Sequence, residues 1–105
     1  MYNRFMRIIV MFDLPTATTE DKREYLHFRT GLIKLGFDML QFSVYSRITR
    51  NNDDARKYIN KVKVILPPVG SVRVLQVTEK QYVSMIIMLG DKNADRKFID
   101  YGRFN

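Results

Sequence analysis

The feature that most constrains how this chain can fold is a run of apolar residues near its start. Residues 5–12 read FMRIIVMF, so Arg7 alone interrupts the run, and β-branched side chains lie at its centre. A short apolar run of this kind is typical of a strand buried on both faces of a sheet. It ends at Asp13-Leu14-Pro15, where the proline cannot donate a hydrogen bond to a sheet ladder.

Two segments have the spacing of amphipathic helices, residues 19–35 and residues 51–66. Thr18 or Thr19 can cap the start of the first, and Gly36 suits the position after its end. The apolar residues that recur at short helical intervals are Tyr25, Phe28, Leu32 and Leu35 in the first helix, and Ala55, Tyr58, Ile59, Val62, Ile65 and Leu66 in the second.

Three further segments are rich in strand-forming residues. Residues 37–49 are either one kinked strand or two strands joined very tightly, and residues 71–78 form another strand. Residues 82–89 are apolar on both faces, so as a strand they need cover, which a second subunit could supply. The order predicts an α+β fold: a ferredoxin-like βαββαβ domain over residues 1–90 with an extra C-terminal strand, an antiparallel sheet and two helices on one face. Residues 91–105 are expected to be a polar tail.

The positive charge of the chain indicates a polyanionic partner. The 105 residues carry a net charge of +7, and Lys and Arg exceed Asp and Glu in both halves of the chain. A charge spread through a folded domain suits a broad nucleic-acid docking surface. The alternative is that the charge serves solubility alone, since a net charge of about 2–8 is common in small domains.

Several classes of site are excluded or disfavoured. With no cysteine, the chain has no disulfide, thiolate metal site or cysteine nucleophile. No apolar run reaches the roughly 18–20 residues of a membrane span, and the N-terminus does not resemble a secretory signal, so we expect a cytoplasmic protein. No glycine-rich phosphate loop is present. His27 is the only histidine, and a lone helical histidine is more often a surface residue than a base.

Asp13 is the best candidate for chemistry. It lies where the buried strand leaves the sheet, a common place for functional groups. After eight residues of apolar strand, its carboxylate is expected to be poorly solvated and to need a partner. One carboxylate holds Mg²⁺ weakly, but a symmetric dimer with Asp13 near its two-fold axis would supply two. The alternative is that Asp13 caps the turn at Pro15.

Basic side chains on the helices and strands are candidates for phosphate contact. Any single one is more often a solvated surface residue, but together they make phosphate contact plausible. The candidates are Lys22, Arg23, Arg29, Arg47, Arg56 and Lys57.

The chain resembles the CRISPR-associated protein 2 family, the small subunit of the spacer-acquisition machinery. The likeness covers about residues 4–90. The segments that carry it are Met11-Phe12-Asp13-Leu14-Pro15-Thr16, Phe28-Arg29, Gly36-Phe37, Gln41-Phe42-Ser43-Val44-Tyr45-Ser46 and Val77-Thr78-Glu79-Lys80-Gln81. The last of these is similar to members that accompany single-protein RNA-guided effectors, the type II flavour.

The resemblance implies a function as well as a fold. It implies a homodimer with Mg²⁺-dependent endonuclease activity, in which Asp13 matches the metal-binding aspartate of the family. It also implies a scaffold that lies between two dimers of a partner integrase and presents a basic face to duplex DNA. Many members carry tyrosine where this chain has Phe12, so a hydroxyl beside the metal is absent here. RNA stays open as a substrate. Two alternatives to the adaptation role are a ferredoxin-like interaction module and a stand-alone, toxin-like ribonuclease.

Overall fold

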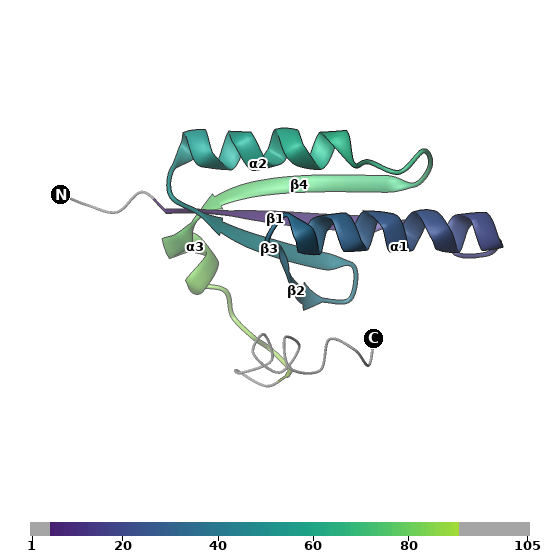
Figure 1. The fold of residues 1–105 in the computed structure, drawn as a ribbon. Helices are drawn as coiled ribbons and strands as arrows, with labels where there is room; N and C mark the ends of the chain where they lie inside the picture. Colours follow the sequence, from purple (N-terminus) through teal and green to yellow (C-terminus); the bar gives the residue numbers. More distant parts are fainter. Residues whose placement is uncertain (1–4, 91–105) are drawn as a thin grey trace.

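The computed structural model describes residues 5–90, which form a four-stranded antiparallel sheet with three helices (Figure 1). In chain order the elements are β1 (Met6–Asp13), α1 (Thr19–Lys34), β2 (Asp38–Gln41), β3 (Val44–Thr49), α2 (Asn52–Val64), β4 (Ser71–Thr78) and α3 (Glu79–Val83). Across the sheet the strands are ordered β2-β3-β1-β4. This order, with α1 and α2 as the connections after β1 and β3, is the predicted ferredoxin-like arrangement.

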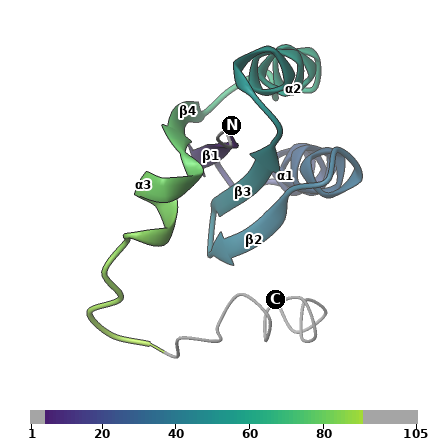
Figure 2. The same ribbon diagram turned by 90° about the vertical axis from the view of Figure 1, so that its left-hand side faces the viewer.

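β1 lies inside the sheet because both of its edges are paired. Val10 is opposite Tyr45 of β3 on one side and Val74 of β4 on the other. Viewed along the strands, α1 and α2 lie together on one face of the sheet and α3 lies on the other (Figure 2). The two helices predicted to share a face are therefore confirmed.

Specific caps fix both ends of α1. Thr18 Oγ1 accepts a hydrogen bond from the Asp21 amide at 3.0 Å, and the Asp21 carboxylate accepts one from the Thr18 amide at 3.2 Å. This reciprocal pair satisfies amides that the first helical turn leaves without partners. At the other end Gly36 has a φ of +89°, and the Phe37 amide donates to the Leu32 carbonyl at 3.0 Å. Glycine adopts this left-handed conformation without a steric penalty, as the sequence predicts.

Residues 37–49 form two strands joined very tightly, which settles the alternative left by the sequence. The register between β2 and β3 is irregular between Met39 and Gln41. Ser43 then turns the chain with a φ of +63°, and its carbonyl accepts a hydrogen bond from the Phe12 amide at 3.1 Å. The turn is therefore fixed to β1 one residue before Asp13.

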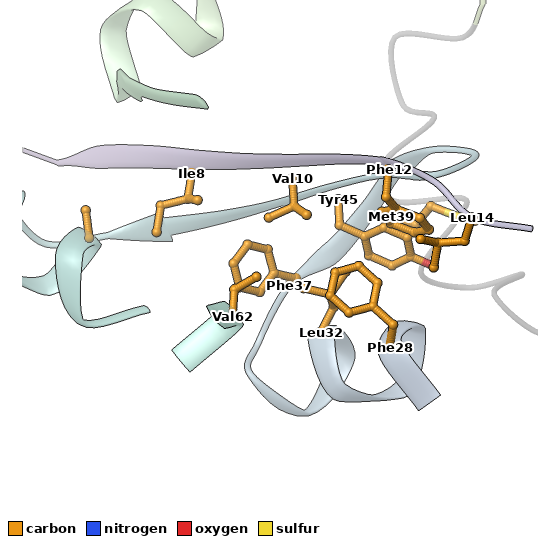
Figure 3. Packing of buried hydrophobic residues seen from close by; sticks show 11 residues of the cluster. Ile8, Val10, Phe12, Leu14, Phe28, Leu32, Phe37, Met39, Tyr45 and Val62 are labelled. Carbon is orange, nitrogen blue, oxygen red and sulfur yellow. The ribbon is translucent and has the colours of Figure 1, made fainter. Parts of the chain in front are cut away.

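The hydrophobic core lies between the sheet and the two helices, and aromatic rings fill one end of it (Figure 3). The Phe12 ring packs edge-on against Phe28, with centroids 5.1 Å apart, and stacks on Tyr45 at 5.8 Å. The buried hydrophobic residues are Ile8, Val10, Phe12, Leu14, Phe28, Leu32, Phe37, Met39, Tyr45, Ala55 and Val62. This core holds β1, and hence the Asp13 end of it, in a fixed position.

The opposite face of the sheet is only partly covered. Arg7 donates to the Glu79 carboxylate through Nε at 2.8 Å and Nη2 at 2.6 Å, and its guanidinium lies 4.0 Å from the centroid of Tyr82. These contacts hold α3 over one end of the face. Ile48 and Leu75 of the same face stay exposed. β1 is therefore buried, as predicted, on the face that α1 and α2 cover, but it is only partly buried on the opposite face.

The predicted last strand, residues 82–89, is wrong. Thr78 and Gln81 form a second reciprocal cap, with hydrogen bonds of 3.0 and 2.9 Å. This cap starts the helix α3, which extends into the segment predicted as a strand. Residues 84–90 pair with no strand, and their apolar side chains are exposed, up to 95% at Leu89. An apolar pattern favours a strand only where a neighbour can pair with it. The predicted polar tail, residues 91–105, lies outside the described residues.

Candidate active site and nucleic-acid interface

A pocket lies where β1 leaves the sheet. It is formed by the end of β1, one side of α1 and the hairpin turn between β2 and β3. Its volume of about 430 Å³ is within the roughly 300–1,000 Å³ of small-molecule sites. We call it the Asp13 pocket. Its lining residues are Asp13, Leu14, Thr16, Tyr25, Leu26, Arg29, Met39, Phe42 and Ser43.

Asp13 is the one carboxylate that lines this pocket. Its side chain is exposed, and within residues 5–90 the carboxylate forms no hydrogen bond or ion pair. The predicted poor solvation is wrong because the strand end opens onto solvent, where the neighbouring apolar residues do not enclose it. The alternative role as a cap of the turn at Pro15 is not observed in this part of the chain either. The carboxylate is therefore available to an external group.

Arg29 is the one basic side chain in the pocket lining, and it lies close to a buried hydroxyl. Burial raises the pKa of the Tyr45 hydroxyl, and the nearby Arg29 guanidinium partly offsets this rise. The Tyr45 hydroxyl has no hydrogen-bond partner of ordinary geometry within residues 5–90. Figure 3 shows Tyr45 at the same end of the core as Leu14 and Met39, both of which line the pocket. Arg29 therefore links the pocket, which it lines, to the buried Tyr45 hydroxyl, which does not line it.

A divalent metal fits this pocket only as a loosely held ion. Within residues 5–90 no three carboxylate, histidine or cysteine side chains are grouped as metal ligands. Mg²⁺ usually takes one or two carboxylates and fills its other positions with water and phosphate oxygens. Asp13 supplies one such ligand. The donor set of one chain therefore suits an ion that arrives with its substrate rather than a permanently bound one.

Three of the predicted phosphate-binding residues are exposed on the outer helical layer. Lys22 and Arg23 lie on α1 and Arg56 lies on α2. Arg23 forms an ion pair with Glu20 at 2.7 Å, and Arg56 forms one with Asp53 at 3.7 Å. Exposed pairs of this kind are weak, so they leave both arginines available to a phosphate.

Two other predicted residues gather around one tyrosine of α2. The Arg47 guanidinium lies 3.8 Å from the ring centroid of Tyr58, and the Lys57 and Lys61 ammonium groups lie at 5.0 and 5.1 Å. Arg47, by hydrogen bonding and by its charge, lowers the pKa of the Tyr58 hydroxyl. We call these residues the Tyr58 cluster. This cluster is a second concentration of positive charge, and none of its residues lines the Asp13 pocket. Of the six predicted basic residues, Arg29 alone lines the same pocket as Asp13.

Sequence reasoning did not single out the hairpin residues of the pocket. Phe42 and Ser43 both line it, although they were noted only as part of the segment that carries the family resemblance. The available signal was an apolar residue, Phe42, between two polar ones at a tight turn, where an apolar side chain has no core to enter. His27 is exposed on α1 and does not line the pocket.

The fold and the pocket together define a small ferredoxin-like protein with an exposed strand-end carboxylate and a basic helical layer. The family model described as CRISPR associated protein Cas2 matches residues 6–85, and the chain belongs to this family. The family predicted from the sequence is thereby confirmed, whereas the type II flavour stays a prediction. None of the helices in residues 5–90 has the length and hydropathy needed to cross a membrane.

Curated relatives with the name CRISPR-associated endoribonuclease Cas2 are similar to most of the chain. The protein of Campylobacter jejuni is 49% identical over 88 residues, which are 84% of this chain and 62% of that protein. The protein of Acidovorax ebreus is 49% identical over 85 residues, covering 81% and 83% of the two chains. The protein of Lacticaseibacillus rhamnosus is 44% identical over 90 residues, covering 86% and 89%. The match thus spans less than two thirds of the Campylobacter protein but most of the other two.

Proposed function

We propose that this protein is a cytoplasmic CRISPR adaptation subunit that acts as a homodimer, binds duplex nucleic acid and can cleave phosphodiesters at Asp13. The observation that carries the proposal is the free Asp13 carboxylate in a pocket that also contains Arg29, in a family whose relatives are named endoribonucleases. The scaffold role and the nuclease role are separable, because the basic helical layer and the pocket use mostly different residues.

The uncovered sheet face supports the homodimer. Ile48 and Leu75 are exposed on it, and the apolar residues 85–89 follow α3 without packing into the core. Apolar side chains that stay exposed in this way are typical of an interaction site. A second copy of the chain would cover it, and a two-fold axis near Asp13 would bring two carboxylates to one ion.

The pocket residues would divide the chemistry among them. Asp13 would hold the divalent ion, and Arg29 would neutralise charge on the phosphate. When bound, Mg²⁺ polarises a phosphate and lowers the pKa of a water molecule. The basic residues of α1 and α2 would contact the nucleic-acid backbone without reading sequence. In the adaptation complex, that face would hold duplex DNA for the partner integrase.

The test compares the purified wild type with Asp13→Asn and with Asp38→Asn, an exposed aspartate at the start of β2. Duplex DNA binding and Mg²⁺-dependent cleavage of RNA and DNA are measured side by side. We expect Asp13→Asn to abolish cleavage and keep duplex binding, and Asp38→Asn to keep both. Cleavage that persists in Asp13→Asn would refute the nuclease assignment. Absence of salt-sensitive duplex binding in the wild type would favour a plain interaction module.

A further inference from the structure

A second pocket lies where β3 ends and α2 begins, far from the Asp13 pocket. Arg47, which lines it, is opposite Ile8 of β1, five residues before Asp13, so the two pockets lie about 17 Å apart along the strand. Figure 1 shows the start of α2 at the opposite end of the molecule from the loop that leads into α1. The volume is about 400 Å³. We call it the Tyr58 pocket; besides Tyr58, its lining includes the charged residues Arg47, Arg50, Asp54 and Lys57.

The charges in the lining of the Tyr58 pocket do not cancel. Arg50 and Lys57 lie 3.7 and 3.4 Å from the carboxylate of Asp54, which can neutralise only one of them. Arg47 forms no ion pair with a carboxylate in the part of the chain that the structure describes. Three basic residues against one acidic residue leave an excess of two positive charges. Because like charges repel one another, an anion bound among them would be stabilised.

Arg47 is held in place by uncharged groups. Its guanidinium lies 3.8 Å from the ring centroid of Tyr58. On another side, a Cβ atom built on Gly36 would lie 3.0 Å from Arg47 Nη1, so the guanidinium fits there because residue 36 has no side chain. Its Nε is buried and has no hydrogen-bond partner within residues 5–90. A guanidinium that is ordered in this way but not neutralised is preorganised to bind an anion.

We propose that the Tyr58 pocket binds a terminal phosphate group, whose oxygens Arg47 and Lys57 contact. A terminal phosphate carries about 1.5–2 negative charges at neutral pH, whereas each phosphodiester of a nucleic-acid backbone carries one. The excess of two positive charges therefore matches a phosphate monoester better than a backbone. The 5′-phosphorylated end of a strand and a free nucleotide share this chemistry. The site does not depend on cleavage at Asp13.

The experiment compares two probes, a short oligothymidine with a 3′ fluorophore and either a 5′ phosphate or a 5′ hydroxyl. Affinities are measured in the Asp13→Asn protein, so that cleavage does not interfere. We expect the 5′ phosphate to raise the affinity about tenfold, as charge-assisted hydrogen bonds would. Added to this background, Arg47→Gln and Lys57→Gln should each reduce the preference to about twofold or less. Arg56→Gln, which removes an exposed charge of α2 outside the pocket, should weaken both probes equally and keep the preference.

Competition with AMP distinguishes the two sources of the phosphate, with adenosine as the control. If AMP displaces the 5′-phosphorylated probe and adenosine does not, the pocket binds a free nucleotide. If neither displaces the probe while the preference for a 5′ phosphate persists, the pocket binds the end of a strand.

Two results would overturn the proposal. The first is equal affinity for the two probes before Arg47 or Lys57 is changed. The second is a preference that survives both Arg47→Gln and Lys57→Gln, because the phosphate would then lie elsewhere. The Lys57 side chain is 50% exposed, so Lys57→Gln keeps the test valid if thermal melting shows that Arg47→Gln is unfolded. Neither result depends on whether the wild type cleaves nucleic acid, so the site and the nuclease assignment can fail separately.

Discussion

Gly70, in the loop before β4, lies directly against the main chain of Asp13. A Cβ atom built on Gly70 would lie 3.0 Å from the Asp13 carbonyl oxygen and 2.5 Å from Cδ2 of Leu14. Gly70 also has a φ of +111°, which an L side chain rarely adopts. The loop can therefore support the end of β1 at this distance only because residue 70 has no side chain.

We expect Gly70→Ala to impair both stability and activity. The strained φ and the close contact should lower the free energy of unfolding by about 1–3 kcal/mol. The displaced strand end should lower cleavage at Asp13 by roughly tenfold or more, since catalysis is sensitive to shifts near 1 Å. Chemical denaturation and cleavage rates, measured where both proteins are fully folded, check the two effects.

Gly90→Ala is the matched control for this substitution. Gly90 also has a positive φ, of +125°, but a Cβ there would meet only the Ile87 side chain, at 3.8 Å. It should therefore leave cleavage unchanged. Equal cleavage by Gly70→Ala and the wild type would show that the contact with Asp13 does not position the site.

The Arg7–Glu79 ion pair should stabilise the fold more than an exposed pair does. Both of its hydrogen bonds are charge-assisted, and the two side chains are only 18% and 23% exposed. We expect Glu79→Gln to lower the free energy of unfolding by about 1–2 kcal/mol, allowing for partial screening by solvent. Urea denaturation at one fixed protein concentration measures this, because association would otherwise shift the midpoint.

Glu20→Gln serves as the comparison for Glu79→Gln. Glu20 pairs with Arg23 at a similar distance, 2.7 Å, but both side chains are about two-thirds exposed. Its loss should cost less than about 0.5 kcal/mol. Equal effects of the two substitutions would show that α3 is not held to β1 by the Arg7 contact.

Much of the fold could be predicted from the sequence because its signals are local. The Thr18 cap, Gly36 and the apolar intervals of the helices depend on neighbours within a few residues. The prediction of a strand at residues 82–89 failed because a strand needs a neighbouring strand to pair with. An apolar pattern in the sequence does not show whether such a neighbour exists. The cap formed by Thr78 and Gln81 was present in the sequence as a Thr-x-x-Gln spacing and identifies a helix start there.

The site was predicted only in part, for a different reason. Asp13 stands out because it follows a buried strand, which is a pattern along the chain. Its meeting with Arg29 and Phe42 depends on how α1 and the hairpin pack on β1, which no sequence interval specifies. Likewise Arg47 and Lys57 both lie over the ring of Tyr58 only because β3 and α2 pack together.

Asp54 should make stability depend on pH in the acid range. The Arg50 amide donates to its carboxylate at 3.0 Å, and this bond, with the nearby Lys57, lowers the pKa of Asp54 in the folded protein. A carboxyl with a lowered folded pKa stabilises the protein above its ordinary titration range, and the contribution is lost as pH falls through the folded value. Asp54→Asn should therefore destabilise the protein at neutral pH, and the difference should shrink in acid.

The check is a series of denaturation curves from neutral to acid pH for the wild type, Asp54→Asn and Asp53→Asn. Asp53 is exposed and makes only a 3.7 Å ion pair with Arg56, so its variant should follow the wild type throughout. A difference between Asp54→Asn and the wild type that stays constant into acid would contradict the assignment, because it would not come from the charged carboxylate.

Removing the Tyr45 hydroxyl should separate stability from activity. The hydroxyl is buried without a hydrogen-bond partner of ordinary geometry, so Tyr45→Phe should leave the free energy of unfolding unchanged or raise it by about 1 kcal/mol. The same change removes the polar group beside the Arg29 guanidinium, which lines the Asp13 pocket. Cleavage at Asp13 should fall by roughly threefold, because the position of Arg29 is then less restricted.

Tyr82→Phe is the control because its hydroxyl lies on the other face of the sheet, 3.3 Å from Ser46 Oγ. That variant should lose a little stability and keep its cleavage rate, the reverse of the pattern at Tyr45. Thermal melting and cleavage rates of both variants give the comparison. Unchanged cleavage by Tyr45→Phe would show that Arg29 is positioned by α1 alone, and a large loss of stability would show that the hydroxyl is satisfied in the folded protein.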